Sequence, residues 1–257
     1  MYDIKYEKQE RIALITLNRP NKRNALSYDL VKDLKEALNI AEEDPDVKVI
    51  ILKAEGTTFC AGADLAYLQK LQEFSFEENL DDSRNLKELF HKIYTMGKVV
   101  IAQVNGHAIA GGCGLAAVCD FSFVVPDAKF GYTEVRIGFV PAIVSVFLIR
   151  KIGEAKTRQM LLTGDLIDAA TAKSWGLINY VVPSPELADK VLEFAKKICV
   201  SNSGESMAYT KKIIAEVPAL GLGAGLEYTA EINAQARSGK DCKLGIAAFL
   251  NKESINW

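Results

Sequence analysis

Two short stretches of this sequence carry residue types that could stabilise negative charge developing on a small molecule. CAGAD (Cys60–Asp64) is a glycine turn before a predicted helix, and AIAGG (Ala108–Gly112) is a glycine turn that opens another predicted helix. Backbone N–H groups are unpaired at the start of a helix, where the helix dipole also favours negative charge. The two turns could therefore each donate one N–H to the same oxygen, which is the arrangement of an oxyanion hole.

One acid, Glu134, follows these turns in the segment FGYTEVRIG. Its apolar neighbours Phe130, Val135 and Ile137 predict partial burial, which raises the pKa of a carboxyl group and suits it to proton transfer. The alternative is a solvated glutamate or an ion-pair partner for Arg136. For the two turns, the alternative is that the glycines only supply unusual dihedral angles and close packing.

The remaining polar candidates favour structural roles. Asp64 is predicted to stabilise a helix N-terminus, and Asp120, between a buried helix and a strand, is predicted to make a structural hydrogen bond. His91 falls on a helix surface and His107 in the second turn, where packing explains it as well as chemistry does. Two isolated histidines argue against a zinc site. The sequence also has no G-x-S-x-G, phosphate-loop or dinucleotide-binding motif.

The elements that position these residues alternate between strand and helix, which indicates an α/β core with parallel strands. Apolar runs predict the strands Arg11–Asn18, Val47–Ala54, Val99–Val104 and Phe121–Val125, with a last strand-like run at Leu177–Pro183. Helices are predicted from Ser27 to Asp44, from near Ala63, over Asp82–Met96, Ala142–Lys151, Glu154–Leu162 and Asp168–Trp175, from Ser184 to about Cys199, and over Glu205–Val217, Leu220–Arg237 and Asp241–Asn251. We therefore expect a core over residues 1–195 and a helical region over residues 196–257.

Composition limits the functional classes. The chain has 257 residues with a net charge of −2, which argues against sequence-independent binding of nucleic acid. The N-terminus is charged, and the longest apolar run, around Phe139–Ile149, is too short to span a bilayer. The five cysteines are scattered and odd in number, so we expect reduced thiols in a cytoplasmic protein with no membrane association.

Several ordered motifs together resemble the crotonase, or enoyl-CoA hydratase/isomerase, superfamily. They are ITLNRPNKRNALS, TTFCAGADL, VVIAQVNGHAIAGGCGLAAVCD, AKFGYTEVRIGFVP and GLINYVV, and the likeness continues to the closing AAFLNKESINW. The resemblance implies an α/β fold, a crotonase-type spiral of ββα units with a helical C-terminal trimerisation region. It also implies an acyl-CoA substrate, a homotrimer or dimer of trimers, and no cofactor, because coenzyme A enters as part of the substrate.

The resemblance assigns roles to individual residues. The oxyanion donors match the N–H groups of Ala63 and Gly111, and the base or acid matches Glu134. The residues matched to substrate binding lie in the basic turn, the two glycine turns and the closing motif: Lys22, Arg23, Ala25, Ala61, Asp64, Leu65, Ala66, Gly112, Gly114 and Lys252. Lys252 matches a residue that can reach a CoA phosphate, in the same or a neighbouring subunit.

One departure from the family pattern bears on the reaction. Hydratases of the family use two glutamates, and the first of them matches Gly114, which has no side chain. A double-bond shift from position 3 to position 2 needs one base, which takes a proton from C2 and returns it at C4, so the single Glu134 favours an isomerase. If the missing acid alone separates the two activities, Gly114→Glu introduces hydration. The stretch FVPAIVSVFLI also departs from the glycine-rich version usual in hydratases.

Other functions stay open at this point. A 2-enoyl-CoA hydratase, including one for branched-chain substrates, is the alternative within the class, and one-acid members of the family also include decarboxylases. A catalytically silent scaffold or RNA-binding member is the alternative from another class. The low net charge and the presence of Glu134 with both glycine turns favour an enzyme.

Overall fold

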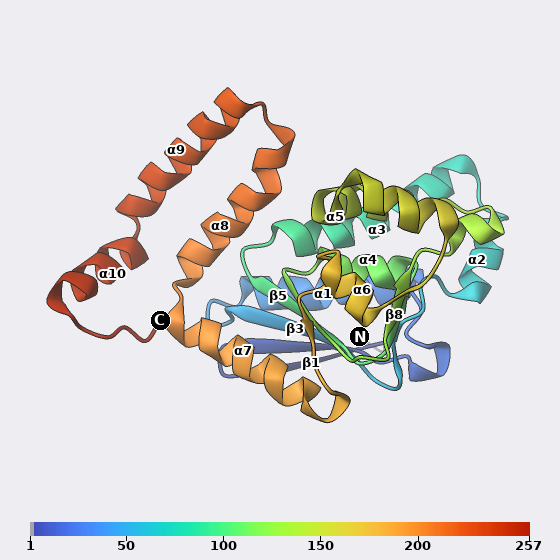
Figure 1. Ribbon diagram of the computed structural model, residues 1–257, viewed down its shortest axis with the longest axis horizontal. Coiled ribbons are helices and arrows are strands. Elements are labelled where there is room, and N and C mark those ends of the chain that lie inside the picture. Colours follow the sequence, from blue (N-terminus) through green and yellow to red (C-terminus); the bar gives the residue numbers. More distant parts are fainter. Residues whose placement is uncertain (1–2) are drawn as a thin grey trace.

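The computed structural model describes residues 3–257, apart from the side chain of Leu65, and contains two β-sheets surrounded by helices (Figure 1). The first sheet has six strands in the order β1-β2-β3-β5-β7-β10. Their bounds are β1 Ile4–Gln9, β2 Ile12–Leu17, β3 Val49–Ala54, β5 Val99–Val104, β7 Phe121–Val124 and β10 Tyr180–Val181. The strands from β2 to β10 run parallel, and β1 pairs antiparallel with β2 at the edge.

The second sheet has four short strands in the order β4-β6-β8-β9. Their bounds are β4 Thr58–Cys60, β6 His107–Ile109, β8 Lys129–Gly131 and β9 Ile167–Asp168. The first three run parallel, and β9 is antiparallel to β8. A strand of the first sheet, a short strand of the second and a helical segment thus follow one another three times, which confirms the expected spiral of ββα units.

The described residues contain ten α-helices. They are α1 Tyr28–Glu43, α2 Leu65–Leu71, α3 Phe76–Thr95, α4 Gly111–Val118, α5 Ala142–Thr163, α6 Ala169–Ser174, α7 Leu187–Ser201, α8 Gly204–Glu216, α9 Leu222–Ser238 and α10 Lys240–Asn251. Helix α7 packs against β2, β3, β5 and β7 from one side of the first sheet, while α1 and α4 lie on the other (Figure 1). No helix of this part of the chain is long and apolar enough to cross a membrane.

Most predicted elements and caps are confirmed. Every residue of β2 is buried, as expected of an apolar strand covered on both faces. The Ser27 side chain accepts a hydrogen bond from the Leu30 N–H and begins α1, and Asp44 ends it. The two helices predicted on either side of residue 153 are both present and follow one another within α5, because Gly153, with a φ of 74°, interrupts the helical geometry between them.

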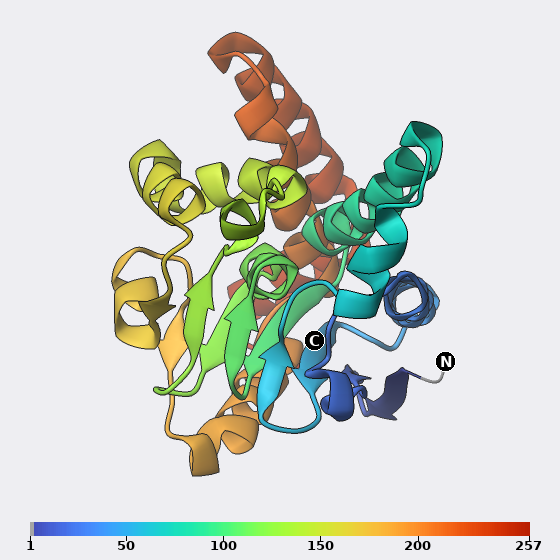
Figure 2. The ribbon, with the colours of Figure 1, turned by 90° about the vertical axis from the view of Figure 1, so that its right-hand side faces the viewer.

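The C-terminal helices α8, α9 and α10 extend away from the sheets (Figures 1 and 2). Buried Lys211 of α8 joins this region to the core by pairing with Asp120 at 2.6 Å. Buried Lys48 donates to the Cys199 and Asn202 carbonyls, at the end of α7 that precedes α8. Asp120 also accepts a hydrogen bond from the N–H of Val100, which is the structural role expected of it. Helix α7 runs through residue 195, so the boundary between the core and the helical region remains a prediction.

Candidate active site

The two glycine turns lie side by side at one edge of the second sheet. They follow β4 and β6, which are parallel neighbours, so both chains leave the sheet at the same edge. A Cβ atom on Gly62 would lie 2.7 Å from the Cβ of Ala110, and one on Gly112 would lie 2.2 Å from the Cys60 carbonyl oxygen. Only glycine allows this approach. A short strand of the second sheet, β4 or β6, separates each turn from the long strand that precedes it.

The predicted donors, the N–H groups of Ala63 and Gly111, make no hydrogen bond to any described residue. Leu26 pairs with Ala63 in an isolated parallel bridge in which the Leu26 N–H donates to Gly62 and the Leu26 carbonyl accepts from Asp64. The Ala63 N–H is therefore left out of this pairing. Gly111 is the first residue of α4, where N–H groups have no partner inside the helix. Ala63 is exposed and Gly111 partly exposed, so both are open to a ligand.

Ala110, between β6 and α4, holds a strained backbone conformation with φ 52° and ψ −126°. A non-glycine residue in this region carries a cost of about 1–3 kcal/mol, and such residues cluster at functional sites. Its own N–H donates to the Gly131 carbonyl at 2.7 Å, which fixes the turn to β8. The sequence could not predict this conformation of Ala110, because alanine, unlike glycine, does not indicate a positive φ.

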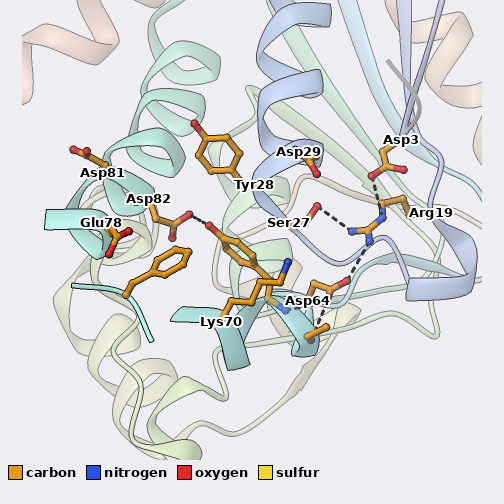
Figure 3. Close-up of a pocket in the computed structure, with 13 residues that line it drawn as sticks. Asp3, Arg19, Ser27, Tyr28, Asp29, Asp64, Lys70, Glu78, Asp81 and Asp82 are labelled. Carbon is orange, nitrogen blue, oxygen red and sulfur yellow. Dashed lines mark hydrogen bonds and ion pairs between the residues drawn. The ribbon is translucent and has the colours of Figure 1, made fainter. Parts of the chain in front are cut away.

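An ion-pair network holds the first turn (Figure 3). Asp64 accepts hydrogen bonds from the N–H groups of Ala66 and Tyr67 and caps α2, as predicted. Its other oxygen pairs with Arg19 at 3.2 Å, and Arg19 also pairs with Asp3 at 3.1 Å. Burial by itself would raise the pKa of Asp64, but the two N–H donors and the Arg19 charge bring that pKa below its ordinary value. The sequence analysis missed Arg19.

Asp64→Ala is expected to lower the free energy of unfolding by about 1 kcal/mol through loss of the cap. In a chain of this size that corresponds to a fall in melting temperature of about 2–4 °C. Turnover should also fall, because Ala63 directly precedes the cap. Asp64→Asn keeps a capping side chain and should retain most of the stability. Equal melting temperatures for wild type and Asp64→Ala would show that the cap does not hold this turn.

Glu134 lies close to the turns because β8 pairs with β6 and the chain reaches Glu134 three residues after β8 ends. It begins a 3-10 helix, Glu134–Ile137, which ends at Gly138 with a φ of 75°. The side chain is half-buried, and its Oε2 is buried without a hydrogen-bond partner among the described residues. Burial raises the pKa of Glu134, although a hydrogen bond from its own backbone N–H partly offsets this.

The structure excludes the ion-pair alternative for Glu134. Arg136 is exposed and pairs with Asp165 at 2.7 Å instead. An unpartnered buried carboxylate oxygen is costly, and such groups are expected at functional sites. The environment of Glu134 therefore disfavours its ionised form and provides no ion-pair partner.

Two buried side chains near Glu134 were missed by the sequence analysis. Tyr132 is fully buried, and its hydroxyl has no hydrogen-bond partner among the described residues. Burial raises the pKa of Tyr132, and the neighbouring Cys113 and Glu134 raise it further. Burial also raises the pKa of Cys113 to about 12, so this thiol is uncharged and is not a nucleophile at neutral pH.

The other residues matched to substrate binding lie in three places. Lys22 and Arg23 are exposed, form no ion pair with a described residue, and join the first turn because the Ala61 N–H donates to the Arg23 carbonyl. Ala25 and Gly112 are buried, Ala61 is half-buried and Ala66 is exposed, whereas the side chain of Leu65 lies outside the described residues. Lys252 caps α10, far from the two turns (Figure 1).

A cavity of about 530 Å³ beside α2 is not suited to the nucleotide end of coenzyme A (Figure 3). Its charged lining residues are Asp3, Asp29, Asp64, Glu78, Asp81, Asp82, Arg19 and Lys70. This excess of carboxylates repels phosphate groups. The exposed pair Lys22 and Arg23 is the better candidate for that contact. No cluster of histidine, cysteine, aspartate and glutamate able to hold a metal ion occurs in the described part of the chain.

Comparison with known proteins agrees with this arrangement. Residues 7–257 match the family model described as enoyl-CoA hydratase/isomerase. A Thermus thermophilus protein, named provisionally as an enoyl-CoA hydratase, is 42% identical over 94% of this chain and 95% of its own length. The crotonyl-CoA hydratase of Syntrophomonas wolfei is 34% identical over 98% of this chain and 96% of its own length.

Solved structures show the same architecture. The enoyl-CoA hydratase of Mycobacterium smegmatis superposes with a TM-score of 0.93 at 30% identity, covering 99% of this chain and 98% of that one. The chain belongs to the enoyl-CoA hydratase/isomerase family, the crotonase superfamily.

Proposed function

We propose that this protein acts on an acyl-CoA thioester, with an enolate held by the N–H groups of Ala63 and Gly111 and Glu134 as the base. The observation that carries the proposal is the buried, unpartnered Oε2 of Glu134, three residues after the strand that pairs with β6, together with two unpaired backbone N–H groups in the glycine turns. A donor pair of this kind stabilises the negative charge that develops on a thioester oxygen, and each donor is worth about a hundred- to a thousandfold in rate.

The reaction best supported by one carboxylate is the shift of a double bond from position 3 to position 2. Glu134 takes a proton from C2, and the electron pair of that C–H bond moves toward the thioester oxygen, giving a dienolate. The carboxylic acid so formed returns the proton at C4, and the double bond reforms between C2 and C3. This isomerisation neither consumes nor releases water. The raised pKa of Glu134 suits both proton transfers.

The remaining proposed roles concern binding and assembly. Lys22 and Arg23 contact the phosphates of coenzyme A, while Ala25, Ala61, Asp64, Leu65, Ala66, Gly112 and Gly114 border the path of the substrate. Because α10 lies far from the turns, Lys252 reaches a phosphate only in a neighbouring subunit. Exposed apolar side chains on α9 and α10, among them Leu222 and Phe249, support a homotrimer or a dimer of trimers. We further propose a cytoplasmic enzyme that needs no cofactor.

Hydration of a 2-enoyl-CoA is the second candidate, and the names of the relatives favour it. In that reaction Glu134 activates a water molecule for attack at C3, and a proton must then be supplied at C2. A silent scaffold or RNA-binding protein is the weakest candidate. It would have no need of a buried carboxylate with a raised pKa.

The activity is expected to depend on pH through Glu134. Because the pKa of Glu134 is raised above the ordinary value of 4.5, Glu134 is protonated at pH values where an exposed glutamate is still ionised. The protonated carboxyl cannot act as a base, so kcat/KM is lost at those pH values. A profile of kcat/KM against pH should therefore rise with an apparent pKa above 4.5. A profile that stays flat down to pH values near or below that value would contradict the assignment of the base.

A paired assay separates the two reactions. Purified protein is given crotonyl-CoA in one reaction and 3-hexenoyl-CoA in another, and the absorbance of the conjugated enoyl thioester is followed. The proposal predicts appearance of this absorbance from 3-hexenoyl-CoA without loss from crotonyl-CoA. Loss with crotonyl-CoA would show hydration, and inactivity on both despite tight thioester binding would refute both assignments for these straight-chain substrates.

A further inference from the structure

The geometry points to Val144 as the residue that limits this site to one carboxylate and thereby disfavours the addition of water. Val144 lies in the first turn of α5, follows the loop that carries Glu134, and is only 5% exposed. Its side chain packs directly on Gly114 of α4. This inference rests on the proposed function, because it concerns which reaction that site performs.

Position 114 is the place from which α4 could present a second acid to the donors. Gly114 lies three residues after Gly111, so the two share one face of the helix. Because Cα–Cβ bonds tilt toward the N-terminus of a helix, a side chain at position 114 would project toward the end of α4 that carries the Gly111 N–H. A carboxylate there would approach the same substrate atoms as Glu134.

Val144 occupies this space. A Cβ atom on Gly114 would lie 2.4 Å from Cγ1 and 3.3 Å from Cβ of Val144, and 3.4 Å from Cζ of Phe90. The first distance is shorter than real Cβ contacts allow, and a branched valine in a helix is held close to one rotamer. We therefore expect that Gly114→Glu does not introduce hydration by itself.

The same contact gives a water molecule no polar side chain to bind next to Gly114 among the nearest atoms. A buried water needs two to four polar partners, and the side chains that meet at Gly114 are those of valine and phenylalanine. Val144 thus acts as a specificity-determining residue: it keeps the acid-base chemistry with Glu134 and excludes the second polar group that would assist hydration.

The contact is tested first by stability, without reference to activity. Gly114→Ala should lower the melting temperature by roughly 5 °C, as expected for overpacking in a close contact. In a Val144→Ala background, which removes the two methyl groups, the same substitution should have little effect. An equal loss in both backgrounds would refute the contact.

The effect on specificity is tested with Gly114→Glu and Gly114→Glu/Val144→Gly. In the double variant, the ratio of crotonyl-CoA hydration to 3-hexenoyl-CoA isomerisation should rise at least tenfold over wild type. It should not rise in Gly114→Glu alone or in the control Gly114→Glu/Val146→Gly, since Val146 lies on the exposed side of α5. An unchanged ratio in a folded double variant, or an equal rise in the single variant, would overturn the inference.

The wild-type protein distinguishes failure of this inference from failure of the proposed function. If wild type hydrates crotonyl-CoA and does not isomerise 3-hexenoyl-CoA, the proposed function is wrong, and with it the role of Val144 in excluding hydration. If wild type isomerises and the double variant shows no rise in the ratio, only the inference about Val144 is wrong.

Discussion

Glu134→Gln is expected to lower kcat by about a thousandfold, the scale of general acid–base catalysis by one side chain. Glutamine has nearly the same shape as glutamate but cannot take a proton from C2. The dissociation constant for a saturated thioester such as hexanoyl-CoA should change little, because the thioester oxygen is held by the backbone of Ala63 and Gly111. Turnover of 3-hexenoyl-CoA and calorimetric titration with hexanoyl-CoA measure the two effects separately.

Glu186→Gln is the matched control for this substitution. Glu186 is also in a 3-10 helix, Ser184–Glu186, but it is exposed and distant in sequence from the turns. It should retain wild-type turnover. Weak thioester binding by Glu134→Gln, together with unchanged turnover of the bound fraction, would contradict the role of Glu134 as the base.

Glu134→Gln should also stabilise the fold at neutral pH. The folded-state pKa of Glu134 is raised above its ordinary value of 4.5, so the folded protein favours the protonated form. Below pH 4.5 the Glu134 carboxyl is protonated in both the folded and the unfolded protein. As pH rises through the folded-state pKa, the wild type loses the stability that the protonated carboxyl gives the folded protein. Glu134→Gln avoids this loss. The melting temperature of the variant should exceed that of wild type at pH 7.5, with the difference shrinking toward pH 4.

Gly111→Pro is expected to lower kcat by about a hundred- to a thousandfold, because it removes one N–H donor of the oxyanion hole. Proline is well tolerated at the first position of a helix, which is the place that Gly111 occupies in α4. Circular dichroism should therefore show a retained helix content. Turnover close to that of wild type would show that the Gly111 N–H does not hold the thioester oxygen.

Gly111→Ala is the control, since it keeps the N–H. A Cβ atom at this position would lie 2.9 Å from Cδ1 of Leu26, the flexible end of a side chain that can move. Most of the activity should remain. If both variants lose activity equally, packing against Leu26 and not the donor accounts for the loss.

Local sequence patterns predicted the parts of the fold that depend on interactions between residues near one another in the sequence. Buried parallel strands are continuous apolar runs, and the Ser27 and Asp64 caps follow from side chains that accept N–H hydrogen bonds. Strand β1 was missed because it is an edge strand whose exposed residues are charged or polar, as edge strands often are. The strands of the second sheet were missed because two or three residues are too few to show a pattern.

In the candidate site, too, some residues could be predicted from local sequence and others could not. Glu134 and the two glycine turns could be identified because acids and glycines in loops are chemically informative. The strain at Ala110, the Arg19 ion pairs and the burial of Tyr132 beside Cys113 depend on contacts between distant segments. Gly114 could be read as a missing acid, but the sequence could not show that Val144 fills the space.

The most direct test of the account is deuterium incorporation into 2-hexenoyl-CoA incubated with the protein in D₂O. Isomerisation in the reverse direction removes a proton from C4 and adds a deuteron at C2 of 3-hexenoyl-CoA, and the forward step removes that deuteron and adds one at C4. Hydration adds a deuteron at C2 of the hydroxyacyl product and does not exchange C4. The account predicts deuterium at C4 of 2-hexenoyl-CoA, with no hydroxyacyl product and no label after Glu134→Gln. A hydroxyacyl product labelled at C2, with no deuterium at C4 of 2-hexenoyl-CoA, would contradict it.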